Sequence, residues 1–223
     1  MVIILYLFFL LLQIHAIAKS NDIFTEIFNT NYWGNVESIS GSGSTLQQTE
    51  ILRAKLPLLL SSLKIKSILD APCGDLNWIR TVDLDQYEYI GIDIVEQLIL
   101  NNQRIFPNKI FLLGNILDDS LPKVDLILCR DCLVHFPNNY IKQALKNFKK
   151  SGSKYLLTTI FTNPKRRVNI EISMGEWRPI DLQRDPFNLK KPILIINEKC
   201  TESNNIFNDK SLALWDLSEL KLK

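Results

Sequence analysis

Two acidic residues enclose a short turn of small residues, Asp70-Ala71-Pro72-Cys73-Gly74-Asp75. Gly74 permits positive φ or close approach of a ligand to the backbone, and the helix predicted to follow would offer free N–H groups at its start. The turn lacks the Gly-x-Gly-x-x-Gly pattern that binds a pyrophosphate. Its two carboxylates would repel the phosphates of a dinucleotide, and they suit a ligand that combines a cation with hydroxyl groups, such as an amino acid joined to a nucleoside.

A third acidic residue, Asp93, has the spacing of a ribose ligand. It ends the next apolar run, about twenty residues after Gly74, which is the distance at which an acidic residue reaches a ribose hydroxyl in nucleotide-binding α/β folds. Asp93 could instead cap the N-terminus of the following helix, and Asp70 and Gly74 could form only a turn between a strand and a helix.

Alternating apolar runs and amphipathic segments must position these residues. The pattern predicts strands at 67–70, 87–93, 110–115, 124–131 and 154–161, and helices from near Thr45 to Pro57 and at 75–82, 95–103 and 138–150. This order predicts an α/β fold with a doubly wound, mostly parallel, Rossmann-like sheet and helices on both faces. The segments 192–197 and 212–217 are expected to form an antiparallel hairpin at one edge of the sheet. Ligands of such sheets bind beyond the carboxyl ends of the strands.

The first residues form a separate region. Twelve apolar residues are followed by Ala16-Ile17-Ala18, which predicts a signal peptide or signal anchor over 1–18. The secretory pathway is therefore the expected location, with the cytoplasm as the alternative, and a membrane is a partner only if this leader is retained as an anchor. Residues 19–223 are expected to form one domain, with an N-terminal cap segment and helix at 19–63 and the core at 64–223.

Composition and cysteine content limit the possible partners. The chain has 223 residues and a net charge of +2, which gives no strong electrostatic case for nucleic acid. Of its four cysteines, only Cys129 and Cys132 have a metal-like spacing, and without a second pair no metal site is predicted. Cys73 and Cys132 could form a disulfide in an oxidising compartment, but buried thiols are the preferred interpretation.

The strand-end motifs together carry a resemblance. "ILDAPCGDLNW", "YIGIDIVEQLI" and "DLILCRDCLVHF", with "YWGNVESISGSGS" upstream, resemble class I S-adenosylmethionine-dependent methyltransferases, and in particular uncharacterised members with "DAPCGD". The resemblance implies that S-adenosylmethionine is the cofactor. It also implies that the methionine part of the cofactor is held by Asp70 and the turn Ala71, Pro72, Cys73, Gly74 and Asp75. The ribose would be bound by Asp93, and the adenine would contact Ile94, Asn115 and Ile116. The cofactor would also be lined by Arg130 and Asp131 and capped by Trp33 and Arg53.

His135 is the candidate general base, because a hydroxyl acceptor must lose a proton during methylation. Asp131 precedes it by four residues and would orient the imidazole if this stretch were helical. His135 could instead be structural, because methyl transfer can proceed by alignment alone. An Asn115 amide oxygen would accept a hydrogen bond from the adenine amino group, where related proteins often carry Asp.

The acceptor is expected to be a small molecule or a glycan, bound by segments outside the core. The candidates are the N-terminal loop, residues 162–169 and residues 175–189, which include Glu176-Trp177-Arg178. An aromatic residue between an acidic and a basic one suits a polar small molecule such as a sugar, although this loop could equally pack under the core. Two other functions stay open: a cofactor-binding interaction module without catalysis, and a dinucleotide-dependent oxidoreductase.

Overall fold

The computed structural model describes residues 23–165 and 168–222. The leader predicted over 1–18 lies outside the described residues. So do Arg166 and Arg167, in the loop at 162–169 that is a candidate for acceptor binding. None of the helices in the described part of the chain is both long and apolar enough to span a membrane.

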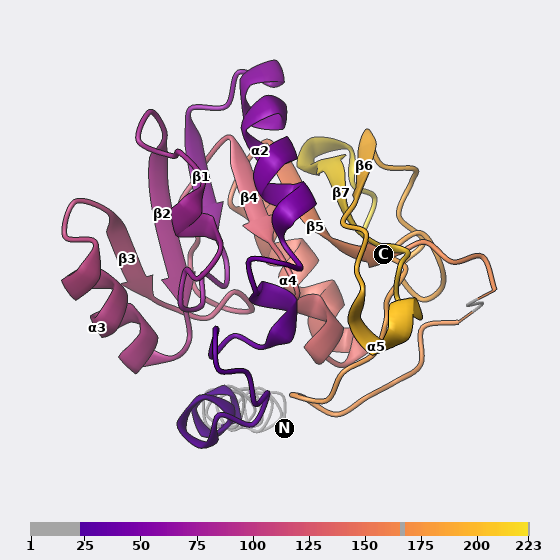
Figure 1. The fold of residues 1–223 in the computed structure, drawn as a ribbon. Coiled ribbons are helices and arrows are strands. Elements are labelled where there is room, and N and C mark those ends of the chain that lie inside the picture. The colour runs from indigo at the N-terminus through magenta and orange to yellow at the C-terminus, as the bar shows by residue number, and fades with distance from the viewer. Residues whose placement is uncertain (1–22, 166–167, 223) are drawn as a thin grey trace, which may run out of the picture.

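Seven strands form one open sheet (Figure 1). Their order across the sheet is β3-β2-β1-β4-β5-β7-β6, and β7 runs antiparallel to both of its neighbours while the other neighbouring pairs are parallel. This confirms the predicted doubly wound, mostly parallel sheet and the antiparallel edge hairpin. The strands are β1 (Ser67–Asp70), β2 (Glu88–Asp93), β3 (Ile110–Leu113), β4 (Leu126–Cys129), β5 (Tyr155–Phe161), β6 (Leu194–Asn197) and β7 (Lys210–Asp216).

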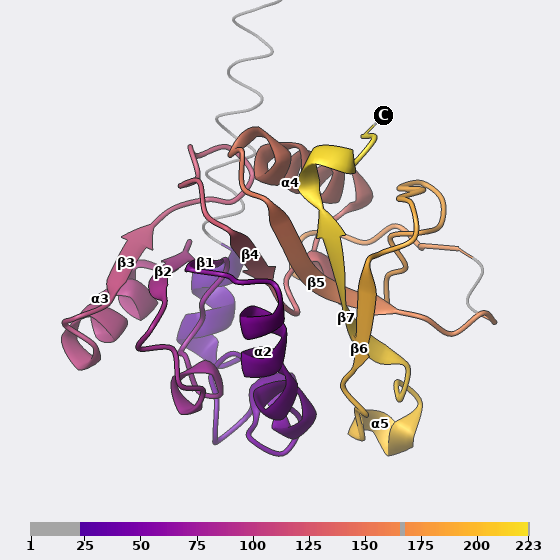
Figure 2. The same ribbon diagram turned by 90° about the horizontal axis from the view of Figure 1, so that it is seen from above.

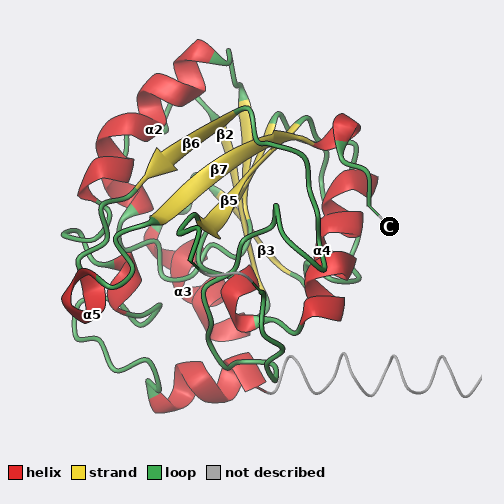
Figure 3. Cartoon of the chain, turned by 90° about the vertical axis from the view of Figure 1, so that its right-hand side faces the viewer, coloured by secondary structure: helices red, strands yellow, loops and turns green. Residues whose placement is uncertain are grey.

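Helices cover both faces of the sheet. Viewed from above, α2 (Glu50–Ser62) lies on one side and α4 (Asn138–Lys150) on the other (Figure 2). α3 (Glu96–Ile105) contributes to the same buried cluster as α2. The short α5 (Glu202–Asn205) follows β6, and a helix at 23–30 lies away from the sheet, along the bottom of Figure 3.

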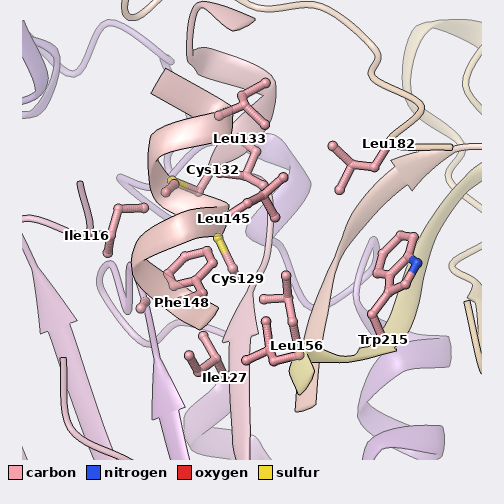
Figure 4. Close-up of a cluster of buried hydrophobic side chains, with 14 of the residues drawn as sticks. Ile116, Ile127, Cys129, Cys132, Leu133, Leu145, Phe148, Leu156, Leu182 and Trp215 are labelled. Atoms are coloured by element: carbon pink, nitrogen blue, oxygen red, sulfur yellow. The ribbon is translucent and has the colours of Figure 1, made fainter. Parts of the chain in front are cut away.

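The cluster between α4 and the sheet is the larger of the two apolar cores. Ile141, Leu145 and Phe148 recur at helical spacing and are fully buried, as an amphipathic helix requires. They pack on side chains of β4 and β5, and the thiols of Cys129 and Cys132 lie among them (Figure 4). Cys73 and Cys132, like the other two cysteines, are buried free thiols, in line with the preferred interpretation.

The prediction of a helix at 75–82 is wrong. The segment forms turns, followed by a single 3-10 turn, η2 (Ile79–Thr81). Asp75 Oδ1 accepts a hydrogen bond from the backbone N–H of Asn77 (3.2 Å), and Leu76 has a φ of 58°. Such side-chain-to-backbone bonds compete with helix formation, so local polar chemistry outweighs the apolar spacing here. α2 also differs, because it begins at Glu50 and continues through Pro57.

Candidate active site

The polar residues that end β1, β2, β3 and β4 line one cavity at the carboxyl edge of the sheet. The chain order reverses between β1 and β4, and such a switch point is where open α/β sheets bind ligands. Thirteen of the predicted site residues line this cavity: Trp33, Asp70, Pro72, Cys73, Gly74, Asp75, Asp93, Ile94, Asn115, Ile116, Arg130, Asp131 and His135. Ala71 and Arg53 are not among its described lining residues, and Arg53 donates to the Leu46 carbonyl oxygen (3.0 Å).

The turn at Gly74 is held by Asp93. The Asp93 Oδ2 atom accepts a hydrogen bond from the Gly74 N–H (2.9 Å), and Oδ1 accepts one from the Val95 N–H (3.0 Å). Burial raises the pKa of Asp93, and the backbone donors at Val95 and Gly74 oppose that rise. Asp93 therefore joins the ends of β1 and β2, and its bond to Val95 also guides the chain into α3.

Asp75 fastens the N-terminal segment over this turn. Its carboxylate accepts hydrogen bonds from the Ser38 hydroxyl (2.8 Å), the Ile39 N–H (3.0 Å) and the Ser40 hydroxyl (3.1 Å). Gly74 has a φ of 58°, and a Cβ atom there would lie 2.4 Å from Ser40 Oγ. A side chain at position 74 would therefore push the covering segment away.

Asp70 is a buried carboxyl group at the end of β1. The Tyr89 hydroxyl donates a hydrogen bond to its Oδ2 atom (2.6 Å). Burial raises the pKa of Asp70 to about 7, although the Tyr89 hydrogen bond acts in the opposite direction. The group can therefore change its charge near neutral pH, and a cation placed beside it would favour the ionised form.

Asn115 presents a donor rather than an acceptor. Its Oδ1 atom accepts a hydrogen bond from the Leu117 N–H (2.9 Å). Its Nδ2 atom is buried with no hydrogen-bond partner among the described residues, although the residue lines the cavity. A buried donor of this kind costs free energy until a ligand pairs with it. The orientation expected from the sequence, with the oxygen facing the ligand, is therefore replaced by one that suits an acceptor such as a ring nitrogen.

Arg130 and Asp131 belong to a buried network of four charged groups. Arg130 Nη2 lies 2.6 Å from Glu198 Oε2, and Arg130 Nη1 lies 3.1 Å from Asp131 Oδ2. Lys210 Nζ is 2.5 Å from the same Asp131 oxygen and 3.8 Å from Glu198 Oε2. Burial opposes ionisation of Asp131, but Arg130 and Lys210 outweigh it and lower its pKa to about 2.

Sequence analysis did not identify Glu198 and Lys210. Glu198 directly follows the edge strand β6 and Lys210 begins its neighbour β7, and neither strand carried a motif. The available signal was that both charged residues lie in the loop between two predicted strands, 192–197 and 212–217.

His135 is oriented by a backbone carbonyl group. Its Nδ1 atom lies 3.0 Å from the Glu176 carbonyl oxygen, which can only accept, so Nδ1 carries the proton and Nε2 keeps its lone pair. Burial lowers the pKa of His135 to about 4, so the ring is neutral at neutral pH. Trp33 stacks beside it, with ring centroids 4.8 Å apart. The residue lies in the 3-10 turn η3 (Leu133–His135), so the helical pairing with Asp131 does not form, and Glu176 takes the orienting role.

Arg178 fixes the loop that supplies this carbonyl group. It is 1% exposed, and its guanidinium donates to the carbonyl oxygens of Ile170, Leu133, Val134 and Phe136, at 2.7–3.2 Å. It also donates to Asn138 Oδ1 (2.9 Å). All five N–H groups are used, so Arg178 is a structural residue rather than part of the polar cluster suggested by its neighbours.

A second cavity, of about 760 Å³, adjoins the first. Trp33, Asp131 and His135 line both. The walls of the second cavity come from the helix at 23–30, the loop at 40–43, the 174–177 loop and the region around α5. Of the predicted run Glu176-Trp177-Arg178, the first two residues line this second cavity. The described residues contain no group of three or more His, Cys, Asp or Glu side chains arranged to hold a metal ion.

The role of Arg178 is tested by Arg178→Lys. Lysine has three donors on one atom and cannot reach five acceptors, so buried carbonyl groups are left unpaired. We expect the free energy of unfolding, measured in urea, to fall by about 2–4 kcal/mol. Arg184→Lys is the control, because that side chain is 36% exposed beside Asp181, and we expect a change below about 0.5 kcal/mol. Equal stability of the two variants would contradict a structural role for Arg178.

Comparisons with known proteins were informative only at the level of structure. No family model matches the chain, and no curated protein matches it either. Among solved structures, the N-methyltransferase NodS from Bradyrhizobium japonicum WM9, in complex with S-adenosylhomocysteine, aligns with a TM-score of 0.55 at 17% identity. That alignment covers 76% of this chain and 85% of NodS.

Two further structures with a bound cofactor align over more of the chain. Human N-acetylserotonin methyltransferase in complex with S-adenosylmethionine has a TM-score of 0.59 at 11% identity, over 86% of this chain and 58% of that protein. Magnesium protoporphyrin IX methyltransferase from Synechocystis PCC 6803, also with S-adenosylmethionine bound, has a TM-score of 0.54 at 10% identity. That alignment covers 88% of this chain and 96% of that protein. The chain therefore has the fold of class I S-adenosylmethionine-dependent methyltransferases.

Proposed function

We propose that the protein is an S-adenosylmethionine-dependent methyltransferase that methylates a hydroxyl group of a small-molecule or glycan acceptor. The observation that carries this proposal is the pair of adjoining cavities with His135 between them. One cavity lies at the switch point of the sheet and suits a cofactor, and the other is of a size that suits a small organic molecule.

The residues of the first cavity fit the three parts of this cofactor. Asp70 is a carboxyl group that a nearby cation would ionise, so it suits the methionine part with its ammonium group. Asp93 suits the ribose hydroxyls, which donate hydrogen bonds to a carboxylate. The unpaired Asn115 amide nitrogen suits an acceptor nitrogen of adenine.

The same cavity fits a dinucleotide poorly. A pyrophosphate needs unpaired cations or free N–H groups, but the Gly74 N–H is taken by Asp93 and the Arg130 charge by Glu198 and Asp131. Asp70 and Asp93 add negative charge to the same wall. These contacts favour the methyltransferase over an oxidoreductase.

The cofactor supplies an electrophilic methyl group on a positively charged sulfur. The chain supplies alignment and a base. With the cofactor bound, Nε2 of His135 would accept the proton of the acceptor hydroxyl, so that its oxygen could take the methyl group. The Glu176 carbonyl group holds the ring in the tautomer that this step needs, and Trp33 limits its rotation.

Cofactor binding is expected to depend on pH through Asp70. Its pKa is about 7 in the free protein, so below that value an ammonium ligand must first displace a proton. The affinity for S-adenosylhomocysteine, measured by calorimetric titration, should rise by up to about tenfold from about pH 6 to pH 7.5. Asp70→Asn should bind more weakly and lose this dependence, whereas the exposed Asp83→Asn should retain it. A flat wild-type profile would contradict the assignment of Asp70.

Catalysis is expected to depend on His135 more than binding does. Replacement by glutamine keeps a polar side chain but removes the base, so kcat for transfer of labelled methyl groups to the acceptor should fall by about 10²–10⁴-fold. The affinity for S-adenosylhomocysteine should change by less than about threefold. If kcat were unaffected, transfer would depend on alignment alone, and the assignment of His135 as the base would be wrong.

A further inference from the structure

The second cavity holds an excess of negative charge. Its described lining includes four carboxylates and one lysine. Lys210 is already paired with Asp131 inside the buried network. The carboxylates of Glu26, Glu176 and Glu202 are left, on a chain whose overall charge is positive.

The hydrogen-bond donors to Glu176 and Glu202 are uncharged, and the cation nearest in effect to Glu202, Arg130, is already paired with Glu198 and Asp131. Glu176 accepts a hydrogen bond from the Ser173 N–H (2.6 Å), and Glu202 accepts one from the Ser42 hydroxyl. Both donors are uncharged, so they orient the carboxylates and leave the charge in place. Glu176 and Glu202 reach the cavity from two different segments, the loop after β5 and the region after β6.

An aromatic wall lies in the same cavity. Trp177, Phe161 and Phe207 pack edge to face, with ring centroids 4.8–5.9 Å apart. Trp177 is 44% exposed, and it follows Glu176 directly in the sequence. Aromatic faces attract cations through their quadrupole, most strongly for Trp. The carboxylates and the aromatic wall are therefore two independent features that favour the same kind of ligand.

We propose that the acceptor carries an ammonium group, which the second cavity binds between the carboxylates of Glu176 and Glu202 and the Trp177 ring. This inference rests on the proposed function and names the substrate class for the same site. Among the described lining residues, a phosphate or carboxylate ligand would meet the carboxylates and a lysine that is already paired.

The placement also determines which atom is methylated. Carboxylates keep an amine in its protonated form, and a protonated amine has no lone pair with which to attack a methyl group. The nucleophile is then a hydroxyl of the same molecule, near His135 at the junction of the cavities. With the cofactor bound, the hydroxyl oxygen would gain the methyl group as the methyl–sulfur bond of S-adenosylmethionine breaks and leaves S-adenosylhomocysteine. The hydroxyl proton would pass to His135, and the ammonium group would stay unchanged.

The test uses glucosamine and glucose, which differ by an ammonium group in place of one hydroxyl. Each is titrated by calorimetry into the full chain, with S-adenosylhomocysteine present. We expect glucosamine to bind at least about tenfold more tightly than glucose. Glu176→Gln and Glu202→Gln should each reduce this preference. The control Glu88→Gln should leave it unchanged, because Glu88 begins β2, at the end of the strand opposite to Asp93 and the cavity.

Failure of this inference is distinct from failure of the proposed function. S-adenosylhomocysteine is first titrated alone, and absence of binding at that step would overturn the proposed function. Suppose that S-adenosylhomocysteine binds but glucosamine shows no saturable binding up to about 10 mM, or binds no more tightly than glucose. Either result would contradict the proposed ammonium site. A preference that survives both glutamine substitutions would overturn it as well.

Discussion

The pairing of Arg130 with Glu198 and of Asp131 with Lys210 is the interaction on which both cavities depend. Four charged groups meet where the ends of β4 and β6 approach the start of β7. Because β7 runs antiparallel to β5, its first residue lies at the carboxyl edge of the parallel strands. The reversed strand thus places Lys210 beside Asp131. Removing one partner from such a network leaves an uncompensated buried charge, which typically costs about 3–5 kcal/mol.

This network also determines the electrostatics of the two cavities. Among the described lining residues, Arg130 and Lys210 are already paired, so the remaining charge on these walls is negative. Asp131 itself stays ionised between the two cavities, and its ion-pair partners are Arg130 and Lys210. The imidazole is hydrogen-bonded by the loop that Arg178 anchors to η3. The charge balance and the base are therefore positioned by separate parts of the fold.

Residues 38–43 of the N-terminal segment cover the site. Asp75 binds the backbone and hydroxyl groups of residues 38–40, and Arg130 Nη2 donates to the Gly43 carbonyl oxygen (2.8 Å). A Cβ atom on Gly43 would lie 3.0 Å from Asp131 and 3.1 Å from Lys210. The glycine-rich sequence of this segment therefore allows it to lie directly on the charged network.

Periodicity and strand-end position predicted the sheet and the polar cavity residues that follow β1 to β4, because parallel strands bring their carboxyl ends together whatever their spacing in sequence. The errors arose where long-range or side-chain contacts decide the structure. Residues 75–82 have helical spacing, but Asp75 bonds to the backbone instead. The roles of Glu198 and Lys210 depend on partners 68 and 79 residues away, and four of the five acceptors of Arg178 lie 40–45 residues away. No local pattern reports such contacts.

The most direct test of the account is a crystal structure of the protein with S-adenosylhomocysteine. The account predicts that the ligand occupies the first cavity, with its ammonium group toward Asp70, its ribose at Asp93 and its adenine at Asn115. Its sulfur would then face His135 and the second cavity. A ligand bound outside this cavity, or protein that crystallises without it from saturating solution, would contradict the assignment of the carboxyl edge as a methyltransferase site.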